Sequence, residues 1–256
     1  MRRHIQVACL SIGSQKWKKS ENLEKVLHFL RRAAGEGADV ALTPAECLEG
    51  QVLQEALSQG READLLDLAE PLEGPCLTEL RNLARDLWMN VVIGFLERVG
   101  DAVYPCALFI ERTGNVAGRC HQIYLDIEEG GGVVRPGQEV RAFDTELGRV
   151  GLILDEDHRD PAIARCLRLD GAQLLFNPAA GPWTRKNDQA VEQLSFATGL
   201  PLMQAHPRTS LIVAEGRRVI KQMGQDRVTS ARIAVPAQPD AALARELERE
   251  ILARRG

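Results

Sequence analysis

The sequence predicts an α/β protein built as a single four-layer α-β-β-α sandwich. Three features of the 256-residue chain point to this fold. Amphipathic helices lie between buried apolar runs, which indicates crossover connections between parallel strands. Close turns join other strands, which indicates antiparallel hairpins. The two halves of the chain also share a similar strand–helix rhythm, and no linker or low-complexity segment separates them.

The first half of the chain alternates strands and helices and then turns to hairpins. Ser20 is the expected cap of its first helix, which should stop at Gly35 or Gly37. Turns at Gly100-Asp101 and at 113–115 predict two successive antiparallel hairpins. The expected elements are strand 4–12, helix 20–38, strand 39–44, helix 74–89 and strands 90–99, 102–112 and 116–125.

The second half repeats the alternation and ends in short strands. Its last three strands are close together in the sequence, so we expect them to form a meander in one sheet. A charged amphipathic helix should follow them. The expected elements are strand 148–154, helix 161–170, strand 172–179, helix 186–199, strands 201–206, 209–216, 217–222 and 227–235, and helix 240–254.

Composition narrows the class of protein. The chain is 45% hydrophobic and 27% charged, with a formal net charge of −4, which argues against a nucleic-acid or anionic-membrane partner. No apolar run approaches the roughly 20 residues of a membrane span, and the apolar run near the N-terminus is too short for a signal peptide. Six cysteines lack CxxC pairing, so we expect free buried thiols in a reducing cytoplasm. We expect no cofactor and no metal.

One stretch, "RVGLILDEDHRDP" at 149–161, places acids where chemistry is expected. The apolar run stops at Asp155, and Pro161 opens a helix. In open α/β sheets, ligands and reacting groups lie just beyond the carboxyl end of a buried strand. Asp155 is therefore expected at a functional position.

Several stretches, in this order, resemble those of the nitrilase superfamily, the carbon–nitrogen hydrolases. The resemblance runs from about residue 5 to residue 235 and implies the four-layer sandwich. The stretches that carry it are "GADVALTPAECLEG", "GNVAGRCHQIYL", "GRVGLILDEDHRDPAIAR", "GAQLLFNPAAGPW" and "TSLIVAEGRRVI".

The resemblance implies a catalytic glutamate, lysine and cysteine, and this chain departs at all three positions. Gapless alignment places Ala45 at the glutamate position, Gln122 at the lysine position and Asp155 at the nucleophile position. Glu46 follows one residue late, and because side chains alternate along a strand it should face away from the site unless the strand end bulges.

Further residues are candidates for the pocket wall. Asp155 is an unpaired carboxylate, and Arg159, His158 or Arg119 could supply its cation. Either Glu128 or Glu129 could correspond to a second acid that the family places near its lysine. The pocket candidates are Glu46, Cys47, Cys120, Glu129, Asp157, His158, Arg159 and Trp183.

Each candidate also has a plainer interpretation. Cys47 and Cys120 fit a role as small buried apolar residues, and Asp157 fits a cap before the helix. Two sharper hypotheses stay open: Asp155 as a covalent nucleophile, and the sequence "DEDH" with Glu46 as a magnesium or calcium site.

Two functions are consistent with these residues. The leading hypothesis is a pseudoenzyme, a nitrilase-fold protein that binds a small molecule or a protein. The alternative is an active amide hydrolase that uses a shifted Glu46 and Asp155 as an unorthodox nucleophile. The resemblance also implies a homodimer, paired through the helices that follow residues 160 and 186.

Overall fold

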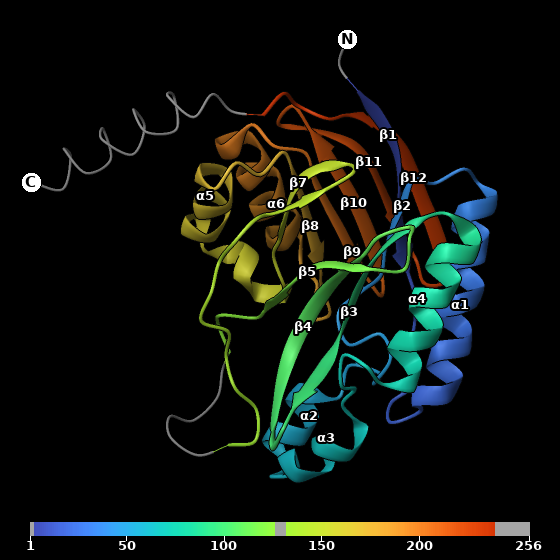
Figure 1. Cartoon of the computed structure of the whole chain (residues 1–256). Coiled ribbons are helices and arrows are strands. Elements are labelled where there is room, and N and C mark those ends of the chain that lie inside the picture. Colours follow the sequence, from blue (N-terminus) through green and yellow to red (C-terminus); the bar gives the residue numbers. More distant parts are fainter. Residues whose placement is uncertain (1–2, 126–131, 239–256) are drawn as a thin grey trace, which may run out of the picture.

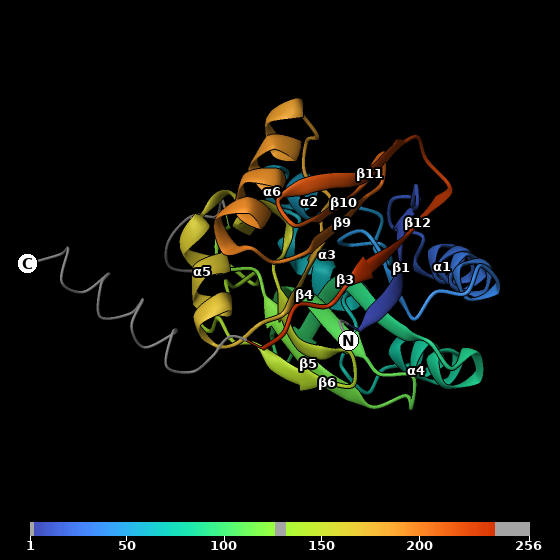
Figure 2. The same cartoon turned by 90° about the horizontal axis from the view of Figure 1, so that it is seen from above.

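The computed structural model describes residues 3–125 and 132–238, and the helix expected at 240–254 lies outside these residues. Two six-stranded sheets pack face to face, with helices on both outer faces (Figures 1 and 2). This is the predicted α-β-β-α sandwich.

The first sheet joins the two ends of the described chain. Its central strands β1, β2 and β3 are parallel neighbours, and β4 and β5 extend it as antiparallel hairpins. Its strand order is β12 (Arg227–Ala234), β1 (His4–Ser11), β2 (Val40–Leu42), β3 (Asn90–Val99), β4 (Ala102–Ile110) and β5 (Val116–His121).

The second sheet has the same plan, with β7, β8 and β9 parallel at its centre. In each sheet the carboxyl ends of the parallel strands lie on the same side, so the loops that follow these strands lie next to one another. The strand order is β11 (Arg217–Met223), β10 (Thr209–Ala214), β9 (Leu202–His206), β8 (Leu174–Pro178), β7 (Gly148–Leu152) and β6 (Phe143–Thr145).

Helices cover the outer face of each sheet. Helices α1 and α4 pack on the first sheet and α5 and α6 on the second, while α2 and α3 lie at one end of β3 and β4 (Figure 1). The helices are α1 (Lys19–Gly35), α2 (Leu53–Ser58), α3 (Glu62–Leu68), α4 (Pro75–Leu87), α5 (Pro161–Leu169) and α6 (Arg185–Thr198), with a 3₁₀ helix, η1 (Asp155–Arg159).

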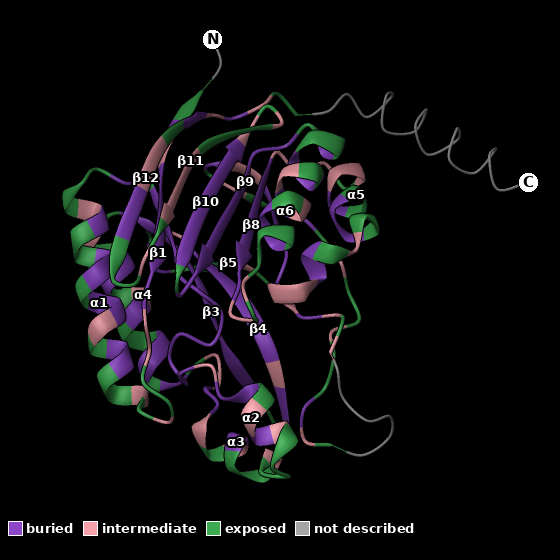
Figure 3. Ribbon diagram, turned by 180° about the vertical axis from the view of Figure 1, so that it is seen from behind, coloured by how far each residue is buried: buried purple, intermediate pink, exposed green. Residues whose placement is uncertain are grey.

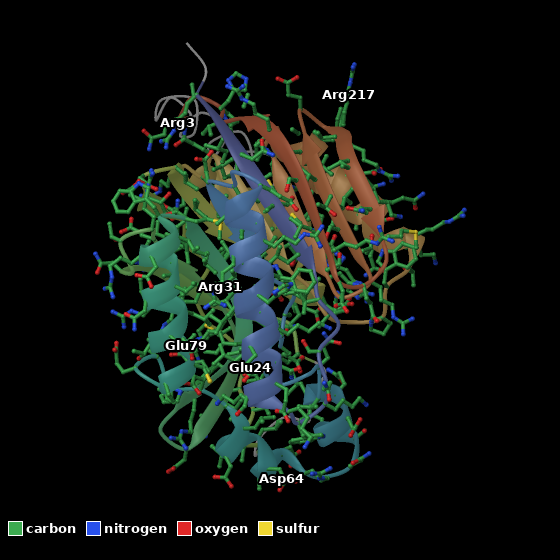
Figure 4. The ribbon with its side chains drawn as sticks, turned by 90° about the vertical axis from the view of Figure 1, so that its right-hand side faces the viewer. Arg3, Glu24, Arg31, Asp64, Glu79 and Arg217 are labelled. Atoms are coloured by element: carbon green, nitrogen blue, oxygen red, sulfur yellow. The ribbon has the colours of Figure 1, made fainter. Side chains whose placement is uncertain are left out.

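Apolar side chains fill three layers, one between the sheets and one under each pair of outer helices. Between the sheets, Phe109 and Phe176 meet edge to face with ring centroids 6.2 Å apart. The central strands of both sheets are buried, whereas β5, β6 and β11 are partly exposed, and each outer helix has one buried and one exposed side (Figure 3). Glu24 and Arg31 of α1 and Glu79 of α4 lie on the exposed side (Figure 4).

The expected meander is wrong. Strands β10 and β11 form a hairpin in the second sheet, but β12 pairs antiparallel with β1 in the first sheet, from His4 with Ala234 to Ser11 with Arg227. An unpaired edge would leave the main-chain groups of β1, a buried apolar strand, without partners. Hydrogen bonding to β1 therefore outweighs closeness in sequence.

Two other expectations need correction. Helix α1 begins at Lys19, one residue before Ser20, and no side chain caps it. Cys166 is exposed on α5 and Cys120 is half-buried, although all six cysteines are free, as expected. The short helices α2 and α3 and the short strand β6 had no prediction, because segments of three to seven residues carry little periodicity.

Among the described residues, no helix is both long and apolar enough to cross a membrane.

Gly94 of β3 lets the segment after β2 pass between the two sheets. A Cβ at Gly94 would lie 2.6 Å from the Cα of Ala45 and 2.8 Å from the Cβ of Pro178. Thr43 Oγ1 accepts a hydrogen bond from the Gly94 amide, and the Gly94 carbonyl accepts one from Cys47. The approach fixes the backbone just before Glu46.

We expect Gly94→Ala to lower the free energy of unfolding by about 1–3 kcal/mol, the usual cost of overpacking a core. The matched control is Gly35→Ala, where nothing lies within 4 Å of the added methyl group. It should leave stability unchanged or slightly raised, because alanine favours helices. Thermal and urea unfolding measure both variants. Equal stability of the two would show that the close approach imposes no constraint.

Candidate functional site

A pocket of about 580 Å³ opens where loops from both sheets meet at the carboxyl ends of their parallel strands. It contains the three polar residues that the sequence singled out on separate segments: Glu46 after β2, Gln122 after β5 and Asp155 after β7. Its full lining is Glu46, Gln51, Leu53, Gln54, Gln122, Asp155, Ala180, Gly181, Pro182, Trp183, His206, Pro207, Arg208 and Gln225.

Glu46 reaches this pocket because its backbone is left-handed, with φ +48°. Strand β2 has already ended at Leu42, so strict alternation of side chains no longer applies. Ala45 is buried beside Gly94 and Pro178 and does not line the pocket. Strict alternation would have turned Glu46 away from the site, and the exception allowed for an irregular strand end is the one realised.

The Glu46 carboxyl is almost fully buried, and its Oε2 accepts a hydrogen bond of 3.0 Å from the Leu53 amide at the start of α2. Burial raises its pKa to about 7, and the nearby negative charge of Asp155 acts in the same direction. Glu46 therefore changes charge within the physiological pH range.

Asp155 begins η1 and also has a left-handed backbone, with φ +47°. Aspartate adopts this conformation more readily than most residues. Its Oδ1 accepts two hydrogen bonds of 2.9 Å, from the amides of Ala180 and Gly181 in the loop after β8. Two main-chain donors therefore hold the carboxylate, in place of the expected arginine or histidine.

Gln122 follows β5 directly, and its Nε2 donates a hydrogen bond of 2.9 Å to the Tyr124 carbonyl. The segment is tied to η1 by Asp157, whose carboxylate accepts hydrogen bonds from the amides of Ile123 and Tyr124. Asp157 is thus a buried residue that links two loops by hydrogen bonds, and it does not line the pocket.

The other candidates from the motif are not in the lining. His158 is buried, with Nδ1 hydrogen-bonded to the Asp155 carbonyl, and burial lowers its pKa. Arg159 pairs with Glu156 at the surface. The carboxylates of Asp155, Glu156 and Asp157 each contact a different part of the protein and do not converge on one point. The structure therefore does not support the hypothesis of a magnesium or calcium site there.

The two candidate cysteines also lie elsewhere. Cys47 is fully buried, donates to Thr43 Oγ1 and packs in the apolar layer under α1 and α4. Cys120 lines a different cavity, beside β5. The packing interpretation is correct for Cys47, and Cys120 also packs against the apolar core between the sheets. Glu128 and Glu129 lie outside the described residues.

Trp183 does line the pocket. Its Nε1 donates to Asp188 Oδ1 at 3.1 Å, and the ammonium of Lys221 lies 4.5 Å from the ring centroid. His206 Nε2 is 2.9 Å from the Gly181 carbonyl oxygen, and burial lowers the pKa of this imidazole. Both residues hold the 180–183 loop that binds Asp155.

Sequence reasoning missed several polar residues of the lining. These come from the start of α2, from the turn after β9 and from the turn between β11 and β12. Their only sequence signal is a position after an apolar run, which many surface residues share. The residues are Gln51, Gln54, Arg208 and Gln225.

The site combines two carboxylates with amide side chains and contains a single arginine, Arg208, among the lining residues described. No thiol and no lysine belongs to that lining. Arg208 is itself exposed. The pocket can therefore accept hydrogen-bond donors and positive charge more readily than it can supply a nucleophile.

Comparisons with known proteins place this geometry in a family. The carbon–nitrogen hydrolase family model matches residues 6–236. Among curated relatives, an N-carbamoylputrescine amidase of Oryza sativa is 28% identical over 69% of this chain and 56% of its own length. A nitrilase of Pyrococcus abyssi is 26% identical over 68% of this chain and 64% of its own length. The chain thus spans less than two thirds of either relative.

Solved structures agree on the fold. An amidase from Nesterenkonia sp. superposes with a TM-score of 0.78 at 19% identity, covering 98% of this chain and 97% of that one. A carbon–nitrogen hydrolase of Helicobacter pylori gives 0.77 at 16% identity, covering 97% and 93%. With the family model matched along nearly the whole sequence, the chain belongs to the carbon–nitrogen hydrolase family of the nitrilase superfamily.

Proposed function

We propose that this chain is a member of the family that does not hydrolyse amides and instead binds a small molecule carrying a protonated amino group. The observation that carries the proposal is the pocket lining, in which Glu46 and Asp155 meet without a thiol or a lysine among the described residues. A buried carboxylate beside a half-buried one favours a cation, because the cation relieves the repulsion and replaces lost solvation.

The absence of hydrolysis follows from the family chemistry that the resemblance implies. A thiolate attacks, a glutamate moves the proton and a lysine stabilises the oxyanion. Asp155 and Gln122 stand at the nucleophile and lysine positions, and Glu46 is the acid that lines the pocket. Two amide donors engage Oδ1 of Asp155, which stabilises it as an anion and weakens it as a nucleophile. The alternative is hydrolysis with Asp155 as the nucleophile. It would also need a group to stabilise the oxyanion, and no lysine is among the lining residues described.

The choice of an amine follows from charge and from one relative. Glu46 and Asp155 can both accept from an ammonium group, and Gln122 can orient a neighbouring polar group. The rice relative is named for N-carbamoylputrescine, a derivative of a diamine. Putrescine and N-carbamoylputrescine are therefore the first probes.

We also propose a homodimer that pairs through α5 and α6. Phe196 on α6 is 77% exposed, and Val219 and Met223 of β11 are exposed as well. Phe196 lies against the turn between β10 and β11, since a Cβ at Gly216 would be 2.8 Å from its ring. An interface between two copies would remove this apolar surface from water. Free thiols support a reducing, cytoplasmic location as part of the same proposal.

The unmodified protein should show no turnover of N-carbamoylputrescine, simple amides or nitriles, because losing any member of a cooperative catalytic set removes most of the rate. Asp155→Cys alone should stay inactive. The double change Gln122→Lys with Asp155→Cys, which retains Glu46, should give measurable ammonia release. Turnover by the unmodified protein that is lost in Asp155→Ala would contradict the proposal.

Putrescine binding should strengthen as the pH rises from 5 to 8. The ligand stays protonated over this range, whereas Glu46 becomes ionised as the pH passes its pKa of about 7. If only the ionised form binds, the affinity lost at pH 5 approaches roughly a hundredfold, the inverse of the ionised fraction. Calorimetry measures the profile.

Glu46→Gln should flatten that profile and weaken binding at pH 8. The matched control is Glu49→Gln, which removes another buried carboxyl, one that does not line the pocket. It should keep the slope. A profile that is unchanged in Glu46→Gln would rule out Glu46 as the ligand's partner.

For the dimer, Phe196→Glu should convert the protein to a monomer in light scattering at micromolar concentration, because a buried unpaired charge opposes association. Trp88→Glu is the control, since Trp88 is 61% exposed at the end of α4, outside α5, α6 and β11. A monomeric unmodified protein would refute the proposed assembly.

A further inference from the structure

A second group of reactive side chains lies on the outer face of the first sheet. Glu97 of β3, Cys106 of β4 and His121 of β5 bring a carboxylate oxygen, a thiol and an imidazole nitrogen within 4.8 Å of one another. These three strands lie side by side in Figure 1. Within residues 3–125 and 132–238, it is the one group of three such donors found that close.

Strand register explains why these residues meet. Cys106 lies directly opposite His121, and Glu97 lies opposite Tyr104, two residues before Cys106. Residues directly opposite each other, and residues two apart in one strand, share a face of the sheet. All three side chains therefore project from one face, and regular strands on both sides hold them there.

Unlike most surface charges, these side chains are largely buried and have defined partners. Glu97 and Cys106 are buried, and the His121 side chain is 18% exposed. His121 Nε2 lies 2.5 Å from Glu97 Oε2, and the imidazole stacks on Tyr104 with ring centroids 4.5 Å apart. Arg119 pairs with the other oxygen, Oε1. One carboxylate oxygen is thus anchored and the other faces the histidine and the thiol.

A cavity of about 470 Å³ adjoins the group from the solvent side. Tyr104, Arg119 and His121 belong to its wall, together with Pro136 and Gly137. It is separate from the pocket that holds Glu46 and Asp155, and the two share no lining residue. The cavity gives the group an access route and room for a fourth, exchangeable ligand.

We propose that Glu97 Oε2, Cys106 Sγ and His121 Nε2 form a zinc site with an open fourth position. Zinc takes Cys, His and carboxylate ligands at about 2.0–2.3 Å in tetrahedral geometry, so three ligand atoms around it lie roughly 3–4 Å apart. The donors already fit inside 4.8 Å, and a small rotation of His121 away from Glu97 admits the ion. Arg119 on Oε1 is the outer contact that orients a ligating carboxylate.

Charge and protons balance in this site. Zn²⁺ displaces the thiol proton of Cys106 to solvent, and the imidazole of His121 carries its proton on Nδ1 when Nε2 binds the metal. The thiolate and the Glu97 carboxylate offset the two charges of Zn²⁺, and a hydroxide at the open fourth position offsets the charge of Arg119. Arg119 then keeps a partner in Oε1. In the absence of metal the same residues make a buried hydrogen-bonded ion pair, so the test must separate a metal site from that arrangement.

The test measures zinc and cobalt binding to the whole chain. The unmodified protein should bind one equivalent of Zn²⁺ in competition with a chromophoric chelator. Co²⁺ should give a thiolate-to-metal charge-transfer band, which requires a cysteine ligand. Cys106→Ser and His121→Gln should each weaken Zn²⁺ binding at least tenfold, and Cys106→Ser should abolish the band.

Two cysteines serve as matched controls. Cys120→Ser removes a second thiol of the same cavity wall, next to His121 on β5 but outside the group of three donors, and Cys166→Ser removes the exposed thiol of α5. Both should keep the affinity and the band. Circular dichroism checks the fold of every variant, and His121→Gln stands as the second test if Cys106→Ser does not fold.

Three outcomes would overturn the proposal. They are failure of the unmodified protein to bind Zn²⁺, a cobalt band that disappears in Cys166→Ser, and an affinity unchanged in both Cys106→Ser and His121→Gln. In any of these cases the group is an ion-pair network alone.

Discussion

The packing of two sheets face to face sets where the polar groups of the pocket lie. Strand β2 of the first sheet and strand β7 of the second are each followed by a loop that lines the same pocket. The chain must turn sharply after each strand to avoid the opposite sheet. Gly94 supplies the space, because its missing Cβ admits Ala45 and Pro178. Glu46 and Asp155 take up left-handed conformations at these turns. Each costs backbone strain of order 1–3 kcal/mol, which the surrounding contacts must offset.

Once these turns are fixed, the electrostatics of the pocket follow. Asp155 accepts two hydrogen bonds from main-chain amides in the loop after β8. Glu46 is almost fully buried, and burial raises its pKa although the Leu53 amide donates to its carboxyl group. Burial is the largest cause of this shift, and Asp155, in the same pocket, is only half-buried. At the buried carboxylate of Glu97, Arg119 and His121 supply the partners.

Much of the fold was predictable because its signals are local. The hairpin turns at Gly100 and Gly114 and the helices at 161 and 186 depend on residues close in sequence. The departure of β12 to the other sheet was not predictable, because it depends on which distant strand has unpaired main-chain groups. For the site, the position of Asp155 at a strand end could be inferred from its motif. The direction of Glu46 could not, because a single backbone angle reverses it.

The sequence by itself predicted the four-layer sandwich and the position of Asp155 at the end of a buried strand. Periodicity and turn chemistry are properties of neighbouring residues, so they can be read along the chain. Only the tertiary structure decided that Glu46 and Asp155 share a pocket while Cys47 and Asp157 do not line it, and that Glu97, Cys106 and His121 meet on another face. Those meetings depend on strand register and loop geometry between segments up to about a hundred residues apart, and contacts at such separations are fixed only when the sheets pack.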